Sequence, residues 1–285
     1  MSAGVVPAAP HAAPRHAHPP PWPSSLGAVV RQGLRDRRGS VLSWGGSLGA
    51  LGAFMAAVYP SVQKTIEEVA KSYPSGLKQA FGVTSMDTVE GYIHAELFSL
   101  IVPLAIGFFA IRAVAAATVA AEEAGHLDTI LALPVSRRVI IVSAWVVAAV
   151  AAAEVMVIMG ILTFVSGRIA GTHISAGLVA AGVAGVWALA LLFAGVAALA
   201  TGALHNPRLV SGLSLGVLIG MYALDLVGRL AASLDAIRWA SAFRYYGAPL
   251  RDGLDVVSSV GLVAVGAGLL VAGALLFERR DILGP

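Results

Sequence analysis

The sequence contains no cysteine among its 285 residues. This absence excludes disulfide bonds, thiolate metal sites and a cysteine nucleophile. Charged residues are also scarce, at 12% of the chain, against roughly 25% in a typical soluble domain. Hydrophobic residues make up 58% of the chain, and the mean hydropathy is +0.82. This balance is typical of a membrane protein.

Two sequence patterns are missing as well. The chain shows no period-two alternation of apolar and polar residues, which marks the strands of a membrane barrel. Helices are the other structure that satisfies every backbone polar group in lipid. There is also no Gly-Lys dipeptide, and a P-loop needs one to hold the phosphates of ATP. We therefore expect an all-α integral membrane protein whose chain carries no ATP-hydrolysing motor.

Six apolar stretches are each long enough to cross a bilayer, which takes ~20 residues in a helix. They are residues 41–59, 97–121, 139–165, 174–204, 209–227 and 258–277. We expect them to form six transmembrane helices in one membrane domain of residues 26–285. Just before the first, residues 26–38 place apolar side chains opposite arginines at helical spacing. This pattern predicts an N-terminal amphipathic helix lying in the membrane interface.

The first 25 residues have a different composition. Seven of the fourteen prolines and three of the seven histidines fall within the first 24 residues, without an apolar core. This composition predicts a disordered Pro/His-rich tail in residues 1–25 and not a signal peptide.

The distribution of basic residues predicts the orientation in the membrane. An even number of spans places both termini on one side, and Arg31, Arg35 and Arg38 cluster beside the first span. Positive charge there favours cytoplasmic termini. Residues 60–96 and 229–257 are then external segments, and the aromatic residues of the second are typical of interfacial or re-entrant helices. The basic residues form no single patch, so we expect no nucleic-acid partner.

Two ionisable residues are predicted to lie deep in the membrane, Arg112 and Glu154. A charge at mid-bilayer costs at least ~2.5–3.5 kcal/mol on insertion scales, so each needs a partner or a function. Their predicted depths differ by ~8 Å, counted from the ends of their spans at ~1.5 Å per residue. Either the two form an ion pair inside the helix bundle, or Glu154 faces a transport path and favours cationic or polar substrates. Asp225, near the end of the fifth span, is expected at the interface.

The fifth span also carries Gly212, Gly216 and Gly220 at four-residue intervals. Small residues at this spacing let two membrane helices approach closely. The packing partner is either another helix of the same subunit or a helix of a second subunit.

Between the second and third spans lies a polar insert, EEAGHLDTILALPVSRR, at residues 122–138. Apolar residues recur there at helical spacing, carboxylates stand at the start, and Pro134 ends the pattern. This predicts a short amphipathic helix at residues 122–134. Adjacent glutamates beside a histidine also occur in intramembrane proteases that cleave prenylated proteins. Their pattern requires an arginine at the position that Leu127 occupies here, so hydrolysis is disfavoured.

From residue 86 to 138 the sequence closely resembles the permeases of type-2 ATP-binding-cassette (ABC) exporters, in the drug- and antibiotic-export branch common in actinobacteria. The resemblance rests on the EGY…AELF…P run that enters the second span and on the EE-x-x-G-x-L…LALPVSR insert. It extends to the RW-x-S-x-F-x-YY run before the last span and to the RRD motif at residues 279–281.

The resemblance implies a permease half with six helices and both termini in the cytoplasm, paired with itself or with a similar half. It also implies that the insert is a cytosolic coupling helix that contacts an ABC ATPase subunit, with two copies of the ATPase per transporter. The motif places the contact at Glu122, Glu123, Gly125, Leu127, Asp128, Leu131, Leu133, Pro134 and Arg137.

The expected function is therefore ATP-driven export of an amphiphilic small molecule, antibiotic- or drug-like, or of a lipid, across the cell membrane. This chain would be a multi-pass, non-catalytic subunit without a cofactor or metal of its own, and the partner ATPase would bind ATP and Mg. The alternative is an ion-coupled secondary transporter. Such a protein would show an inverted repeat and several intramembrane charges, which the sequence lacks.

Overall fold

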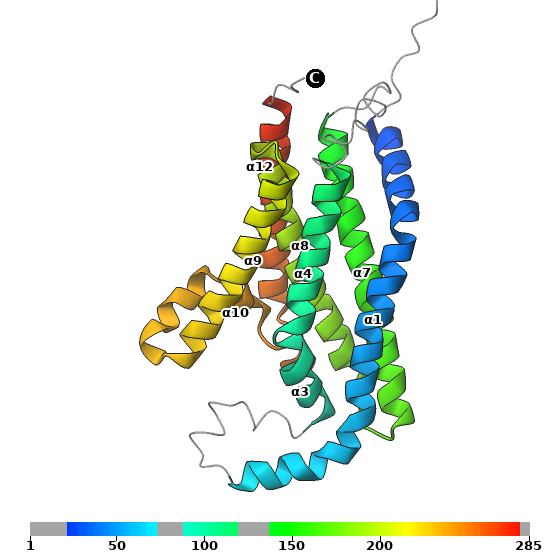
Figure 1. Ribbon diagram of the computed structural model, residues 1–285, viewed down its shortest axis with the longest axis vertical. Coiled ribbons are helices and arrows are strands. Elements are labelled where there is room, and N and C mark those ends of the chain that lie inside the picture. Colours follow the sequence, from blue (N-terminus) through cyan, green and yellow to red (C-terminus); the bar gives the residue numbers. More distant parts are fainter. Residues whose placement is uncertain (1–21, 73–87, 119–136, 280–285) are drawn as a thin grey trace, which may run out of the picture.

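Long helices running side by side make up most of the chain (Figure 1). The computed structural model describes residues 22–72, 88–118 and 137–279, and within these ranges it contains helices and no strands. The elements are α1 (Trp22–Ser72), α3 (Val89–Ile93), η2 (His94–Phe98), α4 (Ile101–Ala117), α7 (Arg137–Ile169), α8 (Ala176–Ala203), α9 (Pro207–Leu230), η3 (Ala232–Ala240), α10 (Ala242–Tyr246), α11 (Pro249–Asp252) and α12 (Val256–Arg279). The predicted all-α class is confirmed for these residues.

Within the described ranges, five helices are long and apolar enough to cross a membrane: α1, α7, α8, α9 and α12. The sixth predicted span is a broken one. The segment Val89–Phe98 and helix α4 pass the same test together, but they are bent by 48° at the break between them. The count is therefore five, or six if the bent pair forms one span.

The break in the second span has a local cause. The amide of Ser99 donates to the His94 carbonyl at 2.8 Å, which is the wider hydrogen-bond spacing of the π-helical turn η2. Pro103 follows four residues later and has no amide hydrogen to donate to the Ser99 carbonyl. Missing bonds and π-turns are the usual causes of sharp kinks in helices. The prediction treated residues 97–121 as one straight stretch because apolar composition does not report the kink.

Helix α1 differs from its prediction in length. The predicted interfacial helix at residues 26–38 is continuous with the first span, and the helix runs on through Pro60 to Ser72. Its far end turns across the bottom of the bundle in Figure 1. Lys64 and Glu68 stand four residues apart in this part, a spacing that supports helix. The predicted external segment therefore begins as an extension of α1.

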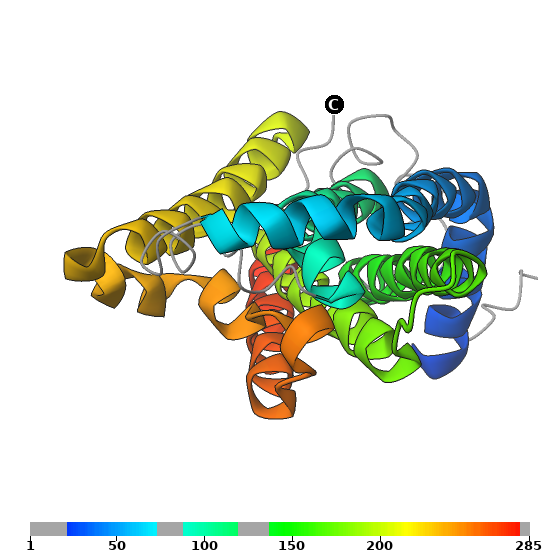
Figure 2. The same ribbon diagram turned by 90° about the horizontal axis from the view of Figure 1, so that it is seen from below.

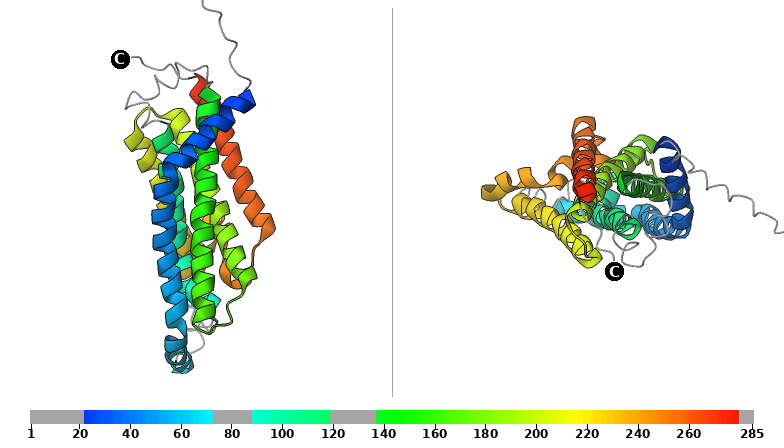
Figure 3. Two further views of the ribbon diagram at one scale, coloured as in Figure 1. Left: turned by 90° about the vertical axis from the view of Figure 1, so that its right-hand side faces the viewer. Right: turned by 90° about the horizontal axis from the view of Figure 1, so that it is seen from above.

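Helix α8 lies beside α7 and α12 in the end-on views of Figures 2 and 3. It packs against α4, α7, α9 and α12, and Phe193 at its middle is completely buried. The contact between α8 and α12 is backbone to backbone. A Cβ atom built on Gly195 would lie 2.3 Å from the carbonyl oxygen of Gly266, and one built on Gly202 would lie 2.3 Å from that of Gly273. Only glycine permits this approach, because any side chain would overlap the facing helix.

The ends of the helices are arranged so that α1, α7 and α9 begin, and α4, α8 and α12 end, at the upper end of the bundle in Figure 1. We call this the upper end, and the opposite one the lower end. The first and last described residues, Trp22 and Arg279, therefore lie at the same end. The lower end carries the bent part of α1, the start of α3, and the short helices η3, α10 and α11.

Candidate functional site

The predicted coupling residues lie mostly outside the described ranges. Glu122, Glu123, Gly125, Leu127, Asp128, Leu131, Leu133 and Pro134 fall between α4 and α7. Arg137 is the first residue of α7. The two helices that flank this segment meet the upper end of the bundle, where α1 begins and α12 ends (Figure 1).

Polar contacts tie together the helices beside this segment. Arg37 of α1 donates a hydrogen bond of 2.6 Å to the carbonyl oxygen of Ala113, near the end of α4. A guanidinium at that position complements the negative end of the helix dipole. At the start of α7, Arg138 forms an ion pair with Glu278 of α12, with one hydrogen bond of 2.6 Å. These contacts join α1 to α4 and α7 to α12 at the upper end.

The two predicted intramembrane charges are not brought together. Arg112 is exposed on α4, on an outward stripe that also carries Phe108 and Ile101. Glu154 is exposed on the outward stripe of α7, together with Val157 and Ile161. Within the described ranges neither residue forms an ion pair. The expected ion pair between Arg112 and Glu154 is therefore not formed within the described residues, because both side chains are exposed on the outer surface of the bundle.

The three glycines of the fifth span are placed on the outer face of α9. All three are exposed, and no described atom comes within 4 Å of a Cβ built on Gly212, Gly216 or Gly220. The opposite side of α9 packs inward through Ser214 and Leu218. Packing of these glycines inside the described part of the subunit, one of the two predicted alternatives, does not occur. Glycines make close helix contacts elsewhere in the described chain, for example between α8 and α12 and between α1 and α7.

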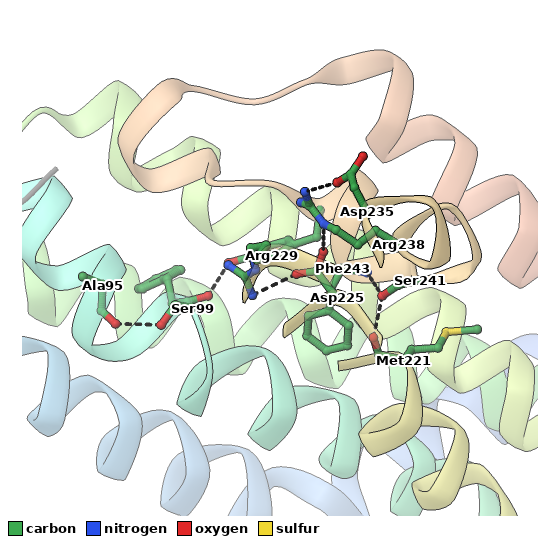
Figure 4. Close-up of polar contacts among 11 residues, drawn as sticks. Ala95, Ser99, Met221, Asp225, Arg229, Asp235, Arg238, Ser241 and Phe243 are labelled. Atoms are coloured by element: carbon green, nitrogen blue, oxygen red, sulfur yellow. Dashed lines mark hydrogen bonds and ion pairs between the residues drawn. The ribbon is translucent and has the colours of Figure 1, made fainter. Parts of the chain in front are cut away.

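A cluster of ion pairs at the lower end was not predicted (Figure 4). The carboxylate of Asp225, near the end of α9, is buried and accepts contacts from Arg229 at 2.8 Å and from Arg238 of η3 at 2.9 Å. Arg238 also reaches Asp235 at 2.9 Å. The hydrogen bond with Asp225 raises the pKa of Arg238 above its usual value. The interfacial depth expected for Asp225 stays a prediction; the structure shows that its carboxylate is buried between two arginines.

Aromatic and hydroxyl groups extend this cluster into the bundle. Ser241 donates a hydrogen bond of 2.6 Å to the carbonyl of Met221 on α9 (Figure 4) and accepts one of 3.1 Å from the amide of Phe243. The ring of Phe243 packs against Tyr222, with ring centroids 5.3 Å apart. Tyr246 of α10 donates to the carbonyl of Phe98 at 3.0 Å, close to the break in the second span. The short helices are thereby attached both to α9 and to the kink.

A second polar contact at the lower end joins α3 to α8. Glu90 is buried, and its carboxylate accepts a 2.6 Å hydrogen bond from the amide of Ser175, which caps the start of α8. A cavity of about 300 Å³ adjoins it, lined by Tyr59, Pro60, Gln63, Thr88, Val89, Glu90, Ala170, Gly171, Thr172 and His173. A negative charge beside a helix start is stabilised by the helix dipole. Within the described ranges no group of three or more metal-binding side chains is found.

A groove of about 300 Å³ lies against Glu154 on the surface between α7 and α8. The groove, the contacts at the upper end and the exposed glycine face of α9 together form the candidate functional site.

Comparison with known protein families identifies a permease family for this chain. Residues 26–278 match the family model described as "Multidrug efflux system permease Rv1217c, C-terminal domain". The comparison with curated proteins finds no match. The family match covers nearly the whole chain and agrees with the predicted resemblance to type-2 ABC permeases. The chain therefore belongs to the multidrug efflux system permease family and is a transmembrane permease subunit.

Proposed function

We propose that this chain is one permease half of an ATP-driven exporter that moves amphiphilic, drug-like molecules out of the cytoplasm or the inner leaflet. The observation that carries the proposal is that α4 ends and α7 begins at the same end of the bundle (Figure 1). The described chain also begins and ends there, with Trp22 and Arg279. A motor bound to the residues between α4 and α7 would sit on this side.

The ATPase must then be a separate chain, because this sequence has no P-loop. In the proposed mechanism two ATPase subunits bind ATP and Mg and close on each other. This movement pushes the coupling segment of residues 122–134. The contacts Arg37 to Ala113 and Arg138 to Glu278 would spread the push from α4 and α7 to α1 and α12. The clustered arginines near the start of α1 favour a cytoplasmic location for this end.

A second permease half would complete the transporter, and the outer face of α9 is the proposed contact. Its three glycines are exposed and leave room for another helix to approach closely. Substrate would pass between the halves as the two rock from an inward-open to an outward-open arrangement.

Co-purification with a candidate P-loop ATPase tests the proposal. Wild type should hold the ATPase in a stoichiometric complex in detergent. Glu123→Arg combined with Leu127→Asp should lose it while the permease remains folded. The matched control makes the same kinds of change at the lower end, Asp252→Arg combined with Leu234→Asp at two exposed positions, and should keep the complex. A wild-type chain that binds no ATPase would contradict the proposal.

A further inference from the structure

Glu154 lies near the middle of α7 and therefore near the middle of the membrane. It stands 17 residues after Arg137 and 15 before Ile169, the first and last residues of the helix. At ~1.5 Å per residue these separations are ~25 Å and ~22 Å. Since the hydrocarbon core is ~30 Å thick, a central position puts the carboxylate far from either interface.

The groove beside this carboxylate is otherwise apolar. It measures about 300 Å³ and is lined by Ala149, Val150, Ala153, Glu154 and Val157 of α7 and by Trp187 of α8. The indole N–H of Trp187 donates a 2.9 Å hydrogen bond to the carbonyl of Ala149. This bond uses the only polar atom of the ring and fixes the ring in the groove wall. The carboxylate is thus the single polar side-chain group of the lining that has no hydrogen bond or ion pair within the described ranges.

A charged carboxylate at this depth needs a counter-charge or must take up a proton. The other deep charge, Arg112, points outward from α4 and makes no ion pair with it. A counter-charge for Glu154 must therefore come from outside the described residues. A volume of about 300 Å³ is at the small end of the range for sites of small organic ligands, roughly 300–1,000 Å³. A fixed tryptophan beside a carboxylate also suits a cation, because an aromatic face attracts positive charge.

We infer that the α7–α8 groove is a subsite for the positively charged end of an amphiphilic organic cation. The ligand's apolar body lies along Val150, Val157 and Trp187, and its cationic centre lies against the carboxylate of Glu154. Because the groove is open on the surface of the bundle at mid-membrane depth, the ligand reaches it laterally from the bilayer. The inference deepens the proposed function by giving its substrate class, and its role in transport rests on that function.

Binding of tetraphenylphosphonium to the purified full-length chain tests the inference, measured by equilibrium dialysis against matching empty micelles. Tetraphenylborate, an anion of nearly the same shape, is the matched ligand control. Wild type should bind the cation saturably. Glu154→Gln should weaken this binding at least ~10-fold, which corresponds to about 1.4 kcal/mol, and Glu154→Asp should retain most of it. Any binding of tetraphenylborate should not be weakened by Glu154→Gln.

Glu96→Gln serves as the matched protein control, because Glu96 is another exposed glutamate but lies on η2, away from the groove. It should bind the cation like wild type. Equal affinities of wild type and Glu154→Gln for tetraphenylphosphonium would overturn the inference, as would an equal loss in Glu96→Gln. The assay contains neither ATPase nor ATP. If the cation binds in a Glu154-dependent way but ATP-driven export fails, the result counts against the proposed function alone. If export occurs without Glu154-dependent binding, the result counts against the subsite alone.

Discussion

The carboxylate of Asp225 accepts a hydrogen bond from the Nε–H of Arg238 at 2.9 Å, and this bond joins the end of α9 to the 3-10 helix η3. The aspartate side chain is 4% exposed, whereas Arg238 is 24% exposed and Arg229, its second partner, 43%. In these ion pairs only the aspartate is buried, and both arginines remain partly exposed to solvent. Loss of the carboxylate would leave two arginines without their main counter-charge at the packed end of a membrane helix.

Asp225→Ala should therefore destabilise the protein by about 2–3 kcal/mol, less than the ~3–5 kcal/mol of a fully buried pair, because water still reaches both arginines. Thermal unfolding of the purified chain in detergent measures the change. Asp235→Ala is the control. Since Asp235 is half exposed, its loss should cost less than about 1 kcal/mol. Equal effects of the two substitutions would show that burial of Asp225 contributes nothing.

The α8–α12 contact predicts a strong position dependence for glycine substitutions. Gly195→Val should destabilise the chain by about 3 kcal/mol, because the new Cβ would overlap the carbonyl of Gly266. Gly216→Val on the exposed face of α9 should change stability of the isolated chain by no more than about 0.5 kcal/mol. Thermal unfolding of both variants makes the comparison. A larger loss at Gly216 than at Gly195 would contradict the packing described here.

Pairing through the α9 glycine face can be tested by cross-linking, because the native chain has no cysteine that could interfere. If two copies of the chain meet there, Gly216→Cys should give a disulfide-linked dimer on mild oxidation in native membranes. Val257→Cys is the control: it is 83% exposed but lies at the start of α12, and it should remain monomeric on a reducing-agent-free gel. If the control forms the dimer and Gly216→Cys does not, the interface between subunits does not lie on α9.

Acid sensitivity should arise in part from Asp255, which caps the start of α12. Its carboxylate accepts hydrogen bonds from the amides of Val257 and Ser258 and from the Ser258 hydroxyl, and the bonds from Ser258 lower the pKa of Asp255. A lowered pKa means that the stabilisation is complete above the unfolded-state value, ~3.9, and is lost as the pH falls through the folded-state value.

The melting temperature of wild type should therefore be level above about pH 5 and should fall below about pH 4. Asp255→Asn keeps a capping side chain but has no proton to bind in this range. Its melting temperature should be less sensitive to pH over the same interval. Identical pH profiles for the two proteins would show that protonation of Asp255 does not change the stability of the fold.

Most of the helical architecture was predictable from the sequence, because apolar runs of sufficient length leave few structures possible in lipid. The positions of α7, α8, α9 and α12 agree with four of the predicted spans. The kink before α4 was missed, since it depends on where the Ser99 and Pro103 backbone bonds are made or lost. Lys64, Glu67 and Glu68 at helical spacing indicated a helix after Pro60. Its continuity with the first span was not predicted, because a proline usually ends or kinks a helix.

The candidate site was less predictable. Four-residue spacing showed that α9 has a small-residue face, but spacing does not identify the partner helix. The close glycine contacts of the described chain include Gly195 with Gly266 and Gly52 with Thr163. The expected pairing of Arg112 with Glu154 came from depth alone. Depth says nothing of direction around the helix axis, and both side chains point outward. The burial of Asp225 depends on η3 folding back over α9, which no local pattern indicates.

Reconstitution of transport tests the proposed mechanism most directly. Purified permease and its candidate ATPase would be placed in sealed vesicles that enclose no ion gradient, and movement of a fluorescent amphiphile would be followed after ATP is added on the ATPase side. We predict transport that requires ATP and both proteins, persists with ionophores present, and is lost with Glu123→Arg combined with Leu127→Asp. Transport by the permease alone that is driven by a proton or sodium gradient, and that ionophores abolish, would contradict ATP-driven export and indicate an ion-coupled transporter.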